Sequence, residues 1–142
     1  RSKVVEALVK KLKLIDGNHP FNSNIFENAH SGMVFLDEIT EYPKLCVVAG
    51  DETRQYQPNE FKWRFLTIDI RVYVEDQEDP QEVLALLMED IERVVDNNDV
   101  LTYDDTVSPK LTTTSLTLQS MSTDEGVLTP LAIGEMTLEC RY

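Results

Sequence analysis

One run of the sequence, residues 61–76, alternates between two kinds of side chain along its whole length. Successive side chains of a β-strand point to opposite faces of the sheet, so a sustained period of two indicates a strand. One set is uniformly apolar and the other is aromatic or polar, which predicts a long strand with a single face in the hydrophobic core. The apolar set is Leu66, Ile68, Ile70, Val72 and Val74, and the opposite set is Trp63, Phe65, Thr67, Asp69, Arg71, Tyr73 and Glu75.

Two amphipathic helices are expected, one on each side of this strand in the sequence. Residues 2–15 repeat apolar side chains with helical spacing and are followed by Gly17, which suits a left-handed cap. Residues 80–97 follow Asp79 as a candidate N-cap and begin with Pro80, which fits the first helical position. The apolar stripes are Val5, Leu8, Leu12 and Ile15 in the first helix, and Val83, Leu84, Leu87, Ile91, Val94 and Val95 in the second.

The remaining segments divide into strands and loops. We expect strands within 33–49, with the stronger one beginning at Pro43, and a hairpin of two strands within 111–142. Residues 16–31 have no clean period, which predicts a long loop. Residues 50–60 are polar and rich in turn formers, which predicts a long hairpin loop or arm before the alternating strand.

These elements predict a single α+β domain over residues 1–142. The expected architecture is a mainly antiparallel sheet of about four strands, with both helices packed on its apolar face. Cys46 and Cys140 lie in apolar strand-like segments, where a free thiol behaves as a small hydrophobic group, and two cysteines favour a reducing compartment over a disulfide scaffold. No apolar run approaches the roughly 20 residues of a membrane span, so we expect a soluble protein.

The charge is strongly negative and unevenly distributed. The chain of 142 residues carries a net charge of -13, which disfavours tight binding to nucleic acid. Residues 75–105 hold twelve acids against the single base Arg93, whereas the first fifteen residues hold five bases against Glu6. Solvated helix faces explain such charge without any function. The alternative is that an acidic and a basic surface meet head to tail between copies of the chain.

Catalytic and metal-binding patterns are absent from the sequence. His19 and His30 are eleven residues apart in an irregular segment, which is not the spacing of a helical metal pair. Residues 96–99 begin like a calcium loop, but Leu101 stands where that loop requires glycine. Adjacent acids such as Glu89 and Asp90 are expected on the solvated side of the second helix. We therefore expect no catalytic residue, no cofactor and no metal ion.

The order of the elements and several of their sequences resemble one known family, the tail terminator (tail completion) proteins of long-tailed, non-contractile bacteriophages. The resemblance covers nearly the whole chain. It is carried by the amphipathic first helix, the loop that contains asparagine, a Thr-rich strand, and the sequences PKLCVVAGDE, KWRFLTIDIRVYVED, DPQEVLALLMEDIERVV and GEMTLECRY.

This resemblance implies a structural virion protein with no catalytic site. Such a protein forms a homo-hexameric ring on the head-proximal end of the tail tube, stops tube polymerisation and provides the surface to which the head attaches. The implied partners are copies of the chain, the tail tube protein and a head-completion or connector protein, while DNA passes through the channel without specific binding. Assembly is expected in the cytoplasm of the bacterial host.

Two alternatives remain at the level of sequence. One is another neck, head-tail joining or tail tube component of the same virion. The other is a small ligand-binding or enzymatic α+β domain, such as a dimeric barrel, which would need a pocket with converging polar groups.

Aromatic and arginine side chains are the usual anchors of protein interfaces, so they are the candidates for assembly contacts here. The loops contribute Phe26, Arg54 and Tyr56, and the outward face of the long strand contributes Trp63, Phe65 and Arg71. Part of the acidic excess would face the channel, where carboxylates repel the phosphates of passing DNA. The candidate channel acids are Glu75, Asp76, Glu78 and Asp79.

Overall fold

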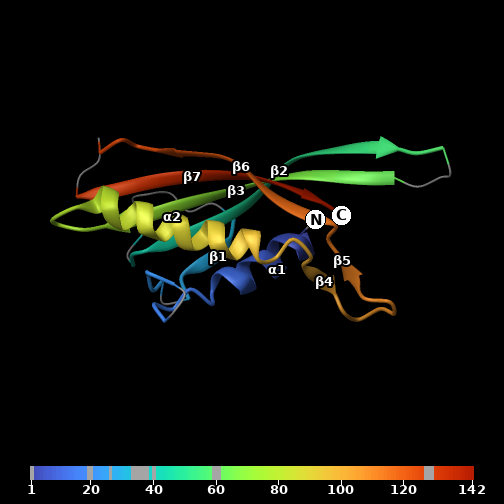
Figure 1. Cartoon of the computed structure of the whole chain (residues 1–142), viewed down its shortest axis with the longest axis horizontal. Coiled ribbons are helices and arrows are strands. Elements are labelled where there is room, and N and C mark those ends of the chain that lie inside the picture. The colour runs from blue at the N-terminus through green and yellow to red at the C-terminus, as the bar shows by residue number, and fades with distance from the viewer. Residues whose placement is uncertain are drawn as a thin grey trace.

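A long, mainly antiparallel sheet forms the frame of the molecule (Figure 1). This computed structural model describes residues 2–18, 21–25, 27–32, 39, 41–58, 62–126 and 130–142, and in these ranges the main sheet has five strands in the order β1-β2-β3-β7-β6. Among these described strands, β1 and β2 pair in parallel and the other neighbours pair antiparallel. The strands are β1 (Ala29–Ser31), β2 (Lys44–Tyr56), β3 (Lys62–Glu75), β6 (Ser115–Thr123) and β7 (Leu131–Arg141).

Both helices cover one face of this sheet. Helix α1 (Ser2–Leu12) packs against β1 and β2, while α2 (Pro80–Asp96) packs against β3, β6 and β7. Their apolar stripes join one hydrophobic core with the inward side chains of the strands. The α+β class and the position of the two helices are therefore as the sequence predicts.

The alternating strand lies at the centre of this core. All five apolar side chains expected on the inner face of β3 are at most 1% exposed. The neighbouring strand β7 adds Ala132, Met136, Leu138 and Cys140, which are fully buried. Between them, Gly134 leaves room for α2, since a Cβ there would lie 2.8 Å from the sulfur of Met88 and 3.1 Å from a methyl carbon of Leu84. Close helix-sheet contact therefore depends on this glycine.

The predicted capping of α2 is confirmed. The Asp79 side chain accepts a hydrogen bond of 3.2 Å from the backbone N–H of Glu82, and Pro80 occupies the first turn. This arrangement satisfies one of the amide groups that a helix start leaves without a partner. The helix ends at Asp96, one residue before the predicted end, with Asn97 as its C-cap.

A small second sheet lies beside α1. It pairs β4 (Thr102–Asp104) with β5 (Leu111–Thr112). Buried Thr113 fixes its base, because its hydroxyl accepts from the backbone N–H of Leu101 at 2.8 Å and donates to the carbonyl of Asp99 at 2.9 Å. Lys3 of α1 reaches the carboxylate of Asp104 at 2.9 Å. The sequence patterns did not predict this sheet.

Several predicted boundaries need correction. The first helix ends at Leu12, although Ile15 is still buried in the core. The predicted loop 16–31 ends in β1, whose three residues are too few to show a period. The sheet consequently has five strands rather than about four. Of the expected strand region 33–49, residues 33–38 and 40 lie outside the described residues.

The second strand is also longer than the apolar pattern indicated. It continues through the polar residues 50–56, past an irregularity between Ala49 and Glu52. Among the described residues, no helix is both long and apolar enough to cross a membrane.

Candidate assembly surfaces

A two-stranded arm extends from one end of the sheet (Figure 1). We define the arm as residues 50–58 of β2 and its following turn together with residues 62–65 of β3. Its backbone is paired by register, with Arg54 opposite Arg64 and Tyr56 opposite Lys62. The arm runs past the helices, so neither of its faces is covered as the rest of the sheet is. Its side chains are consequently exposed or half-buried.

The predicted interface residues of this region divide between the two faces of the arm. Because directly opposite residues of an antiparallel pair share a face, Arg54 and Tyr56 lie on the side of the sheet that carries the helices. Trp63 and Phe65 lie on the other side, which we call the outer face. Arg71 also belongs to the outer face, farther along β3. The sixth predicted residue, Phe26, lies outside the described residues.

Cations and aromatic rings alternate on the helix side of the arm. The Arg54 guanidinium forms an ion pair of 2.9 Å with Glu52, and the Lys62 ammonium lies 5.8 Å from the centroid of the Tyr56 ring. The Arg64 guanidinium lies 5.7 Å from the Tyr142 centroid. Contacts of this kind hold arginine and lysine side chains over aromatic faces.

Tyr142 anchors the base of the arm. Its hydroxyl donates a hydrogen bond to Glu52, and its ring meets Tyr103 edge to face at 5.7 Å between centroids. Burial, followed by the hydrogen bond to Glu52, raises the pKa of Tyr142 to about 12. The hydroxyl is therefore a donor at neutral pH and connects the last strand to the arm.

The outer face carries paired polar groups and one stacked cation. Arg71 lies 3.8 Å from Glu135 on β7, and Thr137 donates a hydrogen bond of 3.0 Å to Asp69. The Arg141 guanidinium lies 4.4 Å from the centroid of the Trp63 ring. Ile39 and Tyr42 pack with Tyr73 and Cys46 and cover part of this face. The surface that remains is half-exposed and carries both polar and aromatic side chains.

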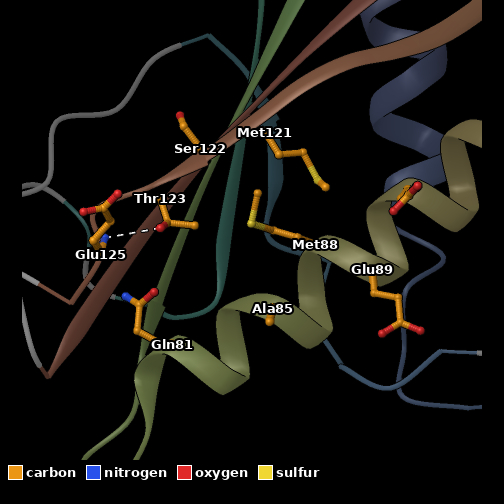
Figure 2. A pocket seen from close by; sticks show the side chains of 9 residues that line it. Gln81, Ala85, Met88, Glu89, Met121, Ser122, Thr123 and Glu125 are labelled. Atoms are coloured by element: carbon orange, nitrogen blue, oxygen red, sulfur yellow. Dashed lines mark hydrogen bonds between the residues drawn. The ribbon is translucent and has the colours of Figure 1, made fainter.

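A groove with acidic walls lies between α2 and the edge strand β6 (Figure 2). Its volume is about 540 Å³. Figure 2 shows Met88 and Met121 on opposite sides of the groove, one on the helix and the other on the strand. Half of the Met121 residue surface is exposed. The groove lining is completed by Gln81, Ala85, Glu89, Glu92, Ser122, Thr123 and Glu125.

One acid of α2 has a structural role that the sequence pattern missed. Asp90 is 0% exposed, and its carboxylate accepts hydrogen bonds from the backbone N–H groups of Asn22 at 3.0 Å and Ser23 at 2.8 Å. The expectation of a solvated Asp90 is therefore wrong. Position 90 lies one turn from Leu87 and Val94 on the packed side of the helix, and this spacing was the available signal. Asp90 fixes the 21–25 segment against α2.

The four predicted channel acids surround the turn between β3 and α2, at the end of the molecule opposite the arm (Figure 1). Two have local partners: Asp76 accepts from the backbone N–H of Glu78 at 3.0 Å, and Asp79 caps α2. Glu75 and Glu78 are exposed. The structure thus brings these four acids together at one turn.

The reactive residue types do not assemble into a site in the described part of the chain. No group of three or more His, Cys, Asp or Glu side chains there could hold a metal ion. Desolvation, followed by the charges of Lys44 and Lys13, lowers the pKa of His30, while His19 lies outside the described residues. Cys46 and Cys140 are free and buried, as predicted, and burial raises the pKa of the Cys140 thiol to about 12.

Comparison with known proteins gives two concordant findings. A family model described as Bacteriophage Tail Tube Terminator Protein matches residues 1–142. The chain is also 36% identical over 151 residues to the Tail tube terminator protein p142 of Escherichia phage T5, an alignment that covers 100% of this chain and 92% of that protein.

Proposed function

Because this chain belongs to the bacteriophage tail tube terminator family, we propose that it forms a hexameric ring that caps the head-proximal end of the tail tube. In this proposal the ring stops tube polymerisation and presents the surface to which the filled head attaches. The protein is a structural component of the virion tail, and its function depends on protein contacts alone. The observation that carries the proposal is the family match over the whole chain.

The distribution of surfaces supports a ring of identical subunits. A closed ring requires a head-to-tail contact in which two different patches of the same chain meet. The arm is rich in cations and aromatic rings, whereas the α2–β6 groove at the other end carries three glutamates. The outer-face residues Trp63, Phe65 and Arg71 are a second proposed contact surface, because they are half-exposed and belong to the usual anchor types.

Three partners follow from this proposal. The tail tube protein would meet one rim of the ring, and a head-completion or connector protein would meet the other. DNA would pass through the channel without specific binding. Glu75, Asp76, Glu78 and Asp79 are proposed to line part of this channel, where their charge would keep phosphates from adhering.

Removal of the chain from the virus tests the proposed function. Phage assembled without it should contain tail tubes that exceed the normal length and do not join heads, as seen by negative-stain electron microscopy. Complementation with the intact chain should restore both properties. Tubes of normal length that still join capsids would contradict the proposal, as would a turnover reaction catalysed by the purified protein.

The channel proposal has its own test. Glu75 and Glu78 are exposed, and within the described residues no hydrogen bond reaches their carboxylates. The double reversal Glu75→Lys with Glu78→Lys should therefore leave the subunit folded. Particles that carry both changes should assemble but eject DNA more slowly, because the new cations bind phosphate. Unchanged ejection kinetics would remove these acids from the channel wall.

A further inference from the structure

The arm is poorly optimised for its own hairpin. Arg54 and Arg64 stand directly opposite each other, and like charges in this position destabilise a strand pair. Tyr56 is 71% exposed near the end of the arm, where its ring contacts Lys62 but is not covered by the core. Local choices that oppose folding are typical of residues that serve another function. These side chains would therefore suit a surface outside their own subunit.

The α2–β6 groove has the complementary chemistry. Its apolar lining consists of Ala85 and the flexible thioethers of Met88 and Met121, which adapt to an inserted ring and make favourable contacts with aromatic edges. Its volume of about 540 Å³ can hold more than one side chain. The groove therefore suits an aromatic anchor such as Tyr56.

The acidic wall of the groove contains an unused carboxylate. Glu89 is exposed and lies 3.5 Å from Arg93 on the same helix. Glu92 is half-buried, and within the described ranges no hydrogen bond or ion pair reaches its carboxylate. An incoming cation stabilises a partly desolvated carboxylate that has no partner. On the arm, Lys62 pairs across the strands with Tyr56, so one ring and one cation would arrive together.

The edge strand beside the groove favours side-chain docking over strand addition. The register of β6 against β7 shifts between Leu118 and Ser120. Such irregularities twist an edge strand and interrupt the row of backbone groups that another strand would need. An incoming chain would therefore dock its side chains into the groove rather than add a strand to the edge of β6.

We propose that the arm of one copy inserts into the α2–β6 groove of the next copy, with Tyr56 against Met88 and Met121 and Lys62 beside Glu92. The arm and the groove lie toward opposite ends of the long axis, so a single chain cannot make this contact with itself (Figure 1). Repetition of the contact is head to tail, as a ring requires. This inference rests on the proposed ring and specifies which two surfaces close it.

Cysteine cross-linking tests the contact directly. The chain with Tyr56→Cys and Met121→Cys should give a ladder of disulfide-linked oligomers after mild oxidation, because the two positions meet between copies. The matched control carries Leu14→Cys in place of Tyr56→Cys and keeps Met121→Cys. Leu14 is 59% exposed on another surface, so this control should give no ladder. The native cysteines, Cys46 and Cys140, are buried and should not interfere.

Charge exchange supplies an independent readout. Lys62→Glu alone and Glu92→Lys alone should each weaken self-association roughly tenfold or more, and the chain with both changes should recover most of the loss. Asp105→Lys, the same charge change at an exposed acid of the β4–β5 connection, should have little effect. Native mass spectrometry measures the oligomers, and circular dichroism verifies that each variant is folded.

The outcomes separate this contact from the proposed ring. Suppose that the native chain forms rings, but the double-cysteine variant gives no ladder and the charge exchange gives no rescue. This result would overturn the arm-groove contact and leave the proposed function intact. A ladder and charge rescue in open chains that never close would support the contact and contradict the ring. Cross-linking of the arm only to tube protein, with none between copies, would also overturn the inference.

Discussion

Strands β2 and β3 run through both the body of the sheet and the arm, yet the same alternation of side chains has different consequences in each. In the body, Ile68 and Ile70 of β3 are fully buried beneath the helices. In the arm, Lys62 and Arg64 occupy the same face of the same strand and have no helix above them. The comparison teaches that the helices, rather than the strand pairing, decide which residues stabilise the fold and which remain available for assembly.

The largest expected effect separates these two regions by stability. Ile70→Ala should lower the free energy of unfolding by about 3 kcal/mol, because it leaves a cavity in the core. Tyr56→Ala should change it by less than about 0.5 kcal/mol, because that ring is exposed. Urea unfolding of both variants measures the difference. Equal losses would show that the arm is part of the cooperative core.

The next effect concerns the buried carboxylate of α2. Asp90→Asn should cost about 2 kcal/mol, because an amide cannot match the charged acceptor of the Asn22 and Ser23 backbone N–H groups. Glu82→Gln on the exposed side of the same helix should cost less than about 0.5 kcal/mol. Urea unfolding again gives the values, and hydrogen exchange should show faster opening of residues 21–25 in the first variant. If Asp90→Asn left the free energy of unfolding unchanged, this would contradict the role of Asp90 in fixing residues 21–25.

A smaller effect distinguishes the acids of the β3–α2 turn from one another. Asp79→Ala should lower stability by about 1 kcal/mol, because it removes the N-cap of α2. Glu78→Ala, one residue earlier and exposed, should be nearly neutral. Thermal unfolding followed by circular dichroism compares them. If both variants lost equal stability, the cap would not explain the difference.

The smallest expected effect is a pH dependence at the second sheet. Hydrogen bonds from Thr106 and then from Lys3 lower the pKa of Asp104 from 3.8 to about 2. The lowered pKa stabilises the folded state above pH 3.8, and this contribution is lost as the pH falls through about 2. The stability difference between the native chain and Asp104→Asn should therefore be present at pH 5 and vanish near pH 2. A constant difference would refute the assignment.

The sequence predicted the body better than the arm, for physical reasons. Burial imposes a period of two on β3 and a stripe on α2, so both elements were predicted within one or two residues. Residues 50–56 form a strand without an apolar face, since they need only their partner across the hairpin. Composition alone therefore predicts a hairpin loop or arm there, without fixing the strand.

The candidate assembly residues show a similar limit. The alternation along β3 predicted the outward face for Trp63, but nothing in the sequence of residues 50–56 assigned a face to Arg54 or Tyr56. The face depends on register, which places Tyr56 opposite Lys62 and Trp63 opposite Gln55. The acidic groove was not predicted, because it joins residues of α2 to residues of β6 that are distant in sequence. The family resemblance, in contrast, was confirmed by the match over residues 1–142.

Electron microscopy of purified tail tubes mixed with the purified chain tests the central claim most directly. The account predicts a ring of six copies on one end of each tube and no further growth when tube protein is added. Tubes that continue to grow with the chain present, or that bind it along their length without an end ring, would contradict the account.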